Sequence, residues 1–161
     1  MKKLLYVLAT ALCLVACEKN TEGGSSTKGD YVDLGLASGT QWKNVNEMNP
    51  NDAQGFYTYD EAMSLFEKNL PTYKQLEELR VYCIWTWMGN GYKVEGPNGE
   101  SIFLPAAGCR RYDGTVGSGG NYWSATLFWD SKSVYRLDFY SGGVEMAHSS
   151  RDWGLSVRLV R

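Results

Sequence analysis

After residue 29, apolar and polar side chains alternate in two parts of the chain, at residues 31–46 and from residue 84 onward. A helical pattern lies between these two parts. Residues 31–36 and 40–46 alternate as two short strands would, with Gly39 at the turn between them. Alternation returns at Ile84 and predicts strands at residues 84–88, 92–95, 101–104, 122–127, 133–140 and 144–148. A final strand is indicated by one apolar face made of Leu155, Val157 and Leu159.

Two helices are predicted between the strand regions, each opened by a capping box. Thr58 stands three residues before Glu61, and Thr72 stands three residues before Gln75. The first helix carries the apolar stripe Ala62, Leu65 and Phe66, and the inner face of the second is predicted to hold Tyr73, Leu76, Leu79 or Arg80, and Cys83. Strands followed by two helices and an antiparallel meander indicate an α+β fold in one domain.

The first 16 residues have the pattern of a secretory signal. Lys2 and Lys3 precede an apolar run at residues 4–14, which is too short to span a bilayer. The run ends in Leu14-Val15-Ala16-Cys17, which resembles a bacterial lipobox and implies cleavage before Cys17 and lipidation of its thiol. An ordinary signal peptide with an incidental cysteine is the alternative. Residues 17–29 are polar and rich in Gly and Ser, as in a flexible tether, so the domain is expected at residues 30–161.

Charge and cysteine content narrow the class of protein. Loss of two lysines with residues 1–16 lowers the 16 Lys and Arg to 14 against 18 Asp and Glu, a net charge of −4. This balance argues against a nucleic-acid partner, which calls for a basic face. Cys83 and Cys109 would lie in an oxidising compartment, either as a disulfide or as two small buried hydrophobic residues. The sequence predicts no metal site, because no Cys and His spacing suits one.

Short motifs are spread over the whole predicted domain. They are YVDLGLxSGTxW at residues 31–42, LPT at 70–72 with EEL at 77–79, GYKVxGPNG at 91–99, FLPAAG at 103–108 with Arg110, YWSxT at 122–126 and GxSVR at 154–158. Together they resemble the Fibrobacter succinogenes major paralogous domain family. The resemblance implies a C-type-lectin-like fold, shared with formylglycine-generating enzymes, in which the first and last strands pair. In this chain that would bring residues 31–36 against residues 155–160.

The chemistry associated with that fold does not carry over. Gly96 interrupts the Glu-Pro-Asn calcium motif of sugar-binding C-type lectins, so residues 95–98 are predicted to form a turn. Formylglycine-generating enzymes use a reactive cysteine pair near the chain end, whereas the last cysteine here is Cys109. His148 is the only histidine, and no nucleophile elbow accompanies it, so we interpret it as a surface or packing residue. We therefore expect no catalytic residues, no metal and no cofactor.

The aromatic meander after residue 120 is the candidate ligand-binding surface. Its strand phases place Tyr135, Leu137 and Phe139 on one face, and Trp42, Trp85, Tyr122 and Trp123 are also expected in the core. The opposite face and the flanking loops at residues 128–132 and 148–153 would present a site made of Trp129, Asp138, Tyr140, Glu145, Ser149, Asp152 and Trp153. Exposed rings beside carboxylates suit polyhydroxylated or basic ligands.

These features favour a non-enzymatic binding module. We expect a lipoprotein of the bacterial outer membrane that faces outward and binds an extracellular glycan or a surface protein. Lipidated Cys17 is its only expected membrane anchor. Two alternatives stay open: a structural envelope or adhesin component without a small ligand, and a glycan-active enzyme. The sequence leaves the ligand, the leaflet and the oligomeric state undetermined.

Overall fold

The computed structural model describes residues 30–161, and in that part of the chain it contains two helices and eight strands. In chain order these are β1 (Tyr31–Asp33), β2 (Gln41–Lys43), α1 (Tyr59–Phe66), α2 (Tyr73–Tyr82), β3 (Ile84–Trp87), β4 (Gly91–Glu95), β5 (Ser101–Pro105), β6 (Gly120–Leu127), β7 (Ser133–Tyr140) and β8 (Gly143–Ser150). The predicted α+β class with two helices and antiparallel sheet is confirmed. The signal peptide at 1–16, the tether at 17–29 and Cys17 lie outside the described residues.

Both predicted capping boxes are present. The Thr58 hydroxyl accepts from the Glu61 amide, and the Glu61 carboxylate accepts from the Thr58 amide at 2.8 Å. Thr72 and Gln75 make the same exchange at the start of α2. One prediction for α1 is wrong, because Leu65 is 64% exposed. The face of α1 that packs on the core consists of Tyr59, Ala62, Met63 and Phe66 at i, i+3, i+4 and i+7, and Leu65 falls outside that stripe.

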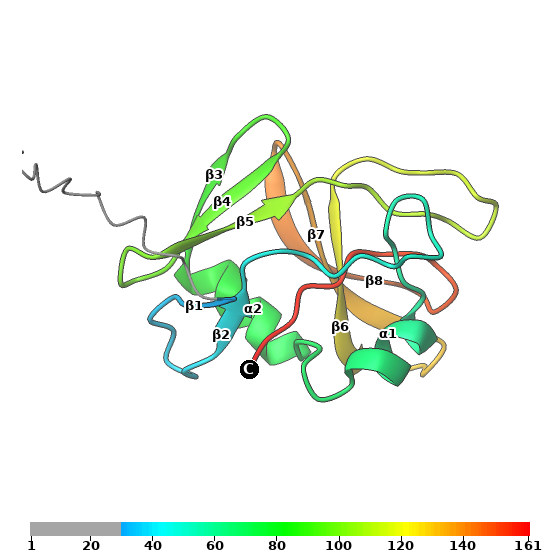
Figure 1. Ribbon diagram of the computed structural model, residues 1–161, viewed down its shortest axis with the longest axis horizontal. Coiled ribbons are helices and arrows are strands. Elements are labelled where there is room, and N and C mark those ends of the chain that lie inside the picture. The colour runs from blue at the N-terminus through cyan, green and yellow to red at the C-terminus, as the bar shows by residue number, and fades with distance from the viewer. Residues whose placement is uncertain (1–29) are drawn as a thin grey trace, which may run out of the picture.

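The strands form three small antiparallel sheets, ordered β1-β2, β3-β4-β5 and β6-β7-β8. The last is the meander predicted from the alternation, and β8 extends through Ser150 rather than ending at His148. Residues 96–99 turn the chain between β4 and β5 as expected, with the Gly99 amide donating to the Gly96 carbonyl at 3.0 Å. Figure 1 shows β3-β4-β5 at one end of the domain and β6-β7-β8 nearer to α1.

The C-terminal segment joins the sheets to one another. The amide of Trp123 in β6 donates to Ser156, and the amides of Lys43 and Gln41 in β2 donate to Leu159 and Arg161. The end of the chain therefore lies beside β2 (Figure 1). The expected joining of the two chain ends is present, but the partner is β2 rather than residues 31–36, because β2 lies between β1 and the C-terminal segment.

Two core clusters fill the spaces between these layers. One packs α2 and β4-β5 against Leu137 and Phe139, and the other packs α1 against Trp123, Val134 and the C-terminal segment. Four of the rings predicted as core have at most 1% of their surface exposed, namely Trp42, Tyr122, Trp123 and Phe139, whereas Trp85 and Tyr135 are partly buried. Among residues 30–161, neither helix is long and apolar enough to span a bilayer.

Candidate functional site

The strand residues of the predicted site share one face of the β6-β7-β8 sheet. Asp138 is the register partner of Glu145, and Tyr140 is that of Gly143, so these side chains point away from buried Leu137. Asp138 is not free, because Arg136 donates to its Oδ2 at 2.9 Å. Glu145 is exposed, and 60% of the Tyr140 surface is exposed.

Trp153 lies beside arginines rather than carboxylates. The guanidinium carbons of Arg111 and Arg136 are 5.7 and 5.8 Å from the centre of its ring, and the ring also packs on the second core cluster. Ser149 is 95% buried within β8, so it does not lie in a rim loop as predicted, whereas Asp152 is exposed. Trp153 thus packs partly on the core and lies beside two arginine side chains.

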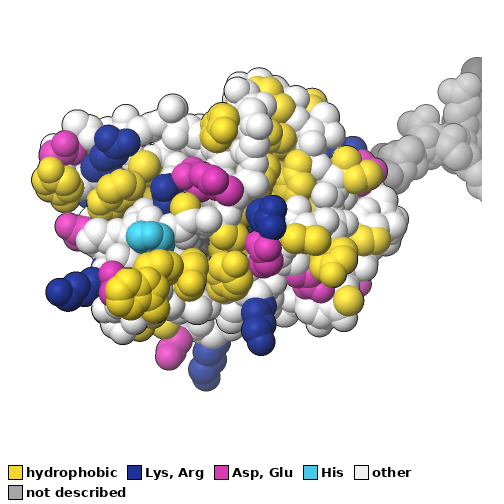
Figure 2. Space-filling model, turned by 180° about the vertical axis from the view of Figure 1, so that it is seen from behind, with side chains coloured by type: hydrophobic (Ala, Val, Ile, Leu, Met, Phe, Trp, Pro, Cys, Tyr) yellow, Lys and Arg dark blue, Asp and Glu magenta, His cyan; other side chains and the backbone are white. Residues whose placement is uncertain are grey.

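Trp129 stands at the edge of a group of rings that we call the ring platform, made of Tyr73, Phe128, Trp129, Tyr135 and His148. The Phe128 ring stacks on His148 at 4.0 Å and meets Trp129 at 5.8 Å and Tyr135 at 5.1 Å, while Tyr135 contacts Tyr73 at 4.5 Å. Trp129 is 83% exposed. Figure 2 shows the single histidine bordered by hydrophobic side chains at the surface.

A tight turn orders the backbone around Trp129. The Asp130 carboxylate accepts from the amides of Ser133 and Lys132 at 2.9 and 3.0 Å, and the Ser131 amide donates to the Phe128 carbonyl. Hydrogen bonding to the Ser133 amide is the main cause that lowers the pKa of Asp130, so the turn keeps its ionised acceptor. The turn therefore orders the backbone that carries the exposed indole.

The predicted site residues do not form one continuous patch. Trp129 precedes β7 and Tyr140 ends it, and a strand of this length separates them by about 23 Å. Ser149 belongs to the opposite face of the sheet from His148 and Tyr135, and Trp153 lies beside Arg136 of that same opposite face. The structure thus splits the predicted surface into the ring platform on one face and a second group on the other face, where Arg136 joins Trp153 to Asp138 and Tyr140 lies at the end of β7.

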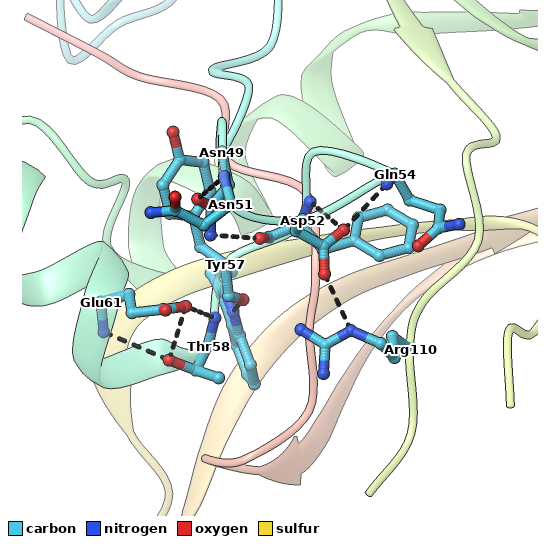
Figure 3. Close-up of polar contacts among 10 residues, drawn as sticks. Asn49, Asn51, Asp52, Gln54, Tyr57, Thr58, Glu61 and Arg110 are labelled. Atoms are coloured by element: carbon cyan, nitrogen blue, oxygen red, sulfur yellow. Dashed lines mark hydrogen bonds and ion pairs between the residues drawn. The ribbon is translucent and has the colours of Figure 1, made fainter. Parts of the chain in front are cut away.

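A pocket that the sequence did not suggest lies between α1 and the loop at residues 49–57. Its volume is about 430 Å³, within the range of about 300–1,000 Å³ typical of small-molecule sites. We call it the α1 pocket, and its lining consists of Asn49, Asn51, Tyr57, Asp60, Glu61, Ser64 and Leu65. Figure 3 shows Asn49, Asn51 and Tyr57 on the loop side of this region and Glu61 on the helix side.

The loop wall of the α1 pocket is held by buried polar groups. Asn49 donates to the Phe56 carbonyl at 2.8 Å and accepts from the Asn51 amide at 3.0 Å. Asp52 accepts from the amides of Gln54 and Phe56 and from Arg110 Nε at 2.8 Å (Figure 3). Burial by itself raises the pKa of Asp52, but these hydrogen bonds together lower it below its usual value. The loop is consequently pre-formed.

On the helix wall of the pocket, Asp60 and Glu61 each accept hydrogen bonds through one carboxylate oxygen. Oε2 of Glu61 accepts from the amide and hydroxyl of Thr58, and Oδ1 of Asp60 accepts from Arg151. Within residues 30–161, the hydrogen bonds to these two carboxylates all go to those oxygens, and none goes to Glu61 Oε1 or Asp60 Oδ2. Each carboxylate is therefore bonded through one oxygen and leaves the other available at the pocket, which Tyr57 also lines.

Nucleophilic chemistry finds little support among the described residues. Cys83 and Cys109 are free thiols that pack with different core clusters. Of the two alternatives, the structure therefore has two separate hydrophobic packing residues and not a disulfide. Burial, followed by the charge of Glu78, raises the pKa of Cys83 to about 11, which leaves almost no thiolate at neutral pH. His148 is exposed and stacked on Phe128, as expected of a packing or surface residue. In residues 30–161 no His, Cys, Asp or Glu side chains converge as metal ligands.

Only a weak sequence signal pointed to the α1 pocket. The segment Asn49-Pro50-Asn51-Asp52 is rich in side chains with hydrogen-bonding oxygens and is separated by five residues from a capping box. No local pattern shows that Asn49 and Asn51 line a pocket with α1. The loop that carries them is held by the salt bridge from Asp52 to Arg110, which is 58 residues away. Comparisons of the chain with protein-family models, with curated proteins and with solved structures found no match.

Proposed function

We propose that this chain is a ligand-binding module of the bacterial cell envelope, anchored by a lipid on Cys17 and built on a C-type-lectin-like fold. Its ligand is an extracellular glycan or a surface protein, and it acts without catalysis. Support for the anchor comes from the lipobox-like Leu14-Val15-Ala16-Cys17 and the polar tether that follows it. Support for binding comes from the ring platform.

The observation that carries this proposal is the exposure of Trp129. An indole that is 83% exposed contributes little to the core, and the hydrogen bonds to Asp130 order the backbone of the turn that carries it. The Phe128 ring lies 5.8 Å from the indole and stacks in turn on His148. A large exposed ring on an ordered turn can stack on the C–H face of a sugar or anchor a protein partner at low entropic cost.

Replacement of Trp129 tests the binding role. The full chain in detergent micelles, either unchanged or as Trp129→Ala, is screened against a glycan array and labelled surface proteins. Tyr112→Ala is the matched control, because Tyr112 is 79% exposed but lies outside the ring platform. We expect Trp129→Ala to lose at least about tenfold in affinity at unchanged melting temperature, whereas Tyr112→Ala binds normally. Equal binding by both variants would show that the ring platform is not the site.

The structural alternative gives a different result in the same experiment. If the ring platform is an interface between copies of the chain, Trp129→Ala changes the oligomeric state in light scattering and no ligand is retained. The lipid anchor is tested separately by Cys17→Ala and cell fractionation. The variant should leave the membrane fraction, and its retention there would contradict the anchor. Protease shaving of intact cells then identifies the leaflet.

A further inference from the structure

We infer that the α1 pocket is a second binding site, which takes a neutral polyhydroxylated ligand the size of one sugar residue. The inference rests on the contacts of the pocket and does not depend on the ring platform. It concerns a different part of the domain, since the pocket is formed by residues 49–57 and α1. Three properties of the pocket lead to this ligand class.

The first property is the pattern of unused hydrogen-bonding atoms. Glu61 Oε1 and Asp60 Oδ2 are acceptors, while the Tyr57 hydroxyl, the Ser64 hydroxyl and the Asn51 amide can donate and accept. Sugar hydroxyl groups also donate and accept, so they can satisfy such a mixed set. A ligand with acceptors alone would leave the two carboxylate oxygens without donors.

The second property is rigidity. One oxygen of Glu61 is held by Thr58, one oxygen of Asp60 is held by Arg151, and the loop is held by Asn49 and Asp52. Glu61 and the loop are thus already positioned before a ligand arrives and need little ordering on binding, whereas Asp60 pairs with Arg151 at the surface. Exposed Leu65 supplies an apolar side for the C–H groups of a sugar ring.

The third property is the balance of charge. Arg151 offsets Asp60, and the positive end of α1 together with the Thr58 amide offsets Glu61. The pocket therefore has acceptor oxygens without a strong demand for a cation. This balance favours a neutral ligand over an amine, and the carboxylates disfavour an anion.

The test uses ligands that differ in charge on a similar ring. The full chain, labelled with nitrogen-15 in detergent micelles, is titrated with the methyl glycosides of glucose, galactose and mannose, and with glucosamine and glucuronate as charged counterparts. We expect at least one neutral glycoside to shift the amide signals of Asn51, Ser64 and Leu65. Glucosamine should bind no more tightly than the neutral sugar, and glucuronate should bind more weakly.

Glu61→Gln is the diagnostic variant. Glutamine keeps the capping box, as Gln75 does in α2, but replaces the free acceptor oxygen by an NH₂ group. It should weaken neutral-sugar binding by about tenfold or more. Glu67→Gln removes the same charge from the C-cap of α1, outside the pocket lining, and it should bind normally. Melting temperatures confirm that both variants fold.

Several outcomes would overturn the inference. These are the absence of shifts with every neutral glycoside, tighter binding of glucosamine than of any neutral sugar, or equal affinities of Glu61→Gln and Glu67→Gln. Trp129→Ala separates this inference from the proposed function. Retained sugar shifts in that variant support a separate site in the α1 pocket, and their loss assigns the sugar to the ring platform and refutes the pocket.

Discussion

Arg158 is the buried cation on which the C-terminal segment depends, and its replacement is expected to be strongly destabilising. Only 1% of its surface is exposed. Its three nitrogens donate to Asn46 Oδ1 at 2.9 Å, to the Lys43 carbonyl at 2.7 Å and to the Phe103 carbonyl at 2.8 Å. Burial lowers the pKa of Arg158, and none of the salt bridges among residues 30–161 pairs it with a carboxylate. Its direct hydrogen bonds therefore go to neutral acceptors, and the charge of Glu47 stabilises the guanidinium without a salt bridge.

The magnitude follows from those three hydrogen bonds. Arg158→Met removes the donor from three acceptors, which costs about 1–3 kcal/mol for each. Part of this loss is offset because a cation no longer has to be buried. We expect a net loss of about 3 kcal/mol in the free energy of unfolding. Arg158→Lys keeps the buried charge, but its ammonium cannot reproduce the planar three-way arrangement, so the loss should be at least as large.

Urea unfolding followed by tryptophan fluorescence measures both variants on the chain from Glu18 onward. A loss of about 3 kcal/mol corresponds to a fall of roughly 10 °C in melting temperature for a domain of this size. Arg161→Met is the control, because Arg161 is exposed and bonds to Gln41. It should cost at most about 1 kcal/mol. A stability for Arg158→Met equal to that of the unchanged chain would refute the reasoning, since apolar packing would then suffice at this position.

Three further results are expected. Asp52→Asn should destabilise the domain by a constant amount near neutral pH, because the lowered pKa of Asp52 contributes stability at pH values above its ordinary pKa of 3.8. The difference in stability between the two proteins should shrink as the pH falls through the folded-state pKa, and a difference that widens would contradict this. Thr58→Ala should cost about 1 kcal/mol in urea unfolding through loss of the N-cap, and an unchanged midpoint would show that the capping box is dispensable. Cys83 should react with iodoacetamide at pH 8 about a hundredfold more slowly than a free thiol of pKa 9.0, and fast labelling would place it outside the core.

Local patterns determined much of this protein. Both helix starts follow from capping boxes that involve residues three positions apart, and the meander follows from period-two alternation. The sequence also placed Asp138 and Glu145 on the face opposite Leu137, because side chains alternate along a strand. These features are determined by neighbouring residues, so they are readable without the fold.

Only the tertiary structure decided which faces are covered and which side chains meet. Leu65 looks like a core residue in sequence, yet it is exposed because α1 packs through a neighbouring stripe. Residues chosen as one site were separated, since strand phase gives a direction but not a position on the surface. The Asp52–Arg110 salt bridge behind the α1 pocket spans 58 residues, and the bond from Arg158 to Asn46 spans 112. Contacts at such separations depend on how the sheets and the C-terminal segment pack, which no local pattern specifies.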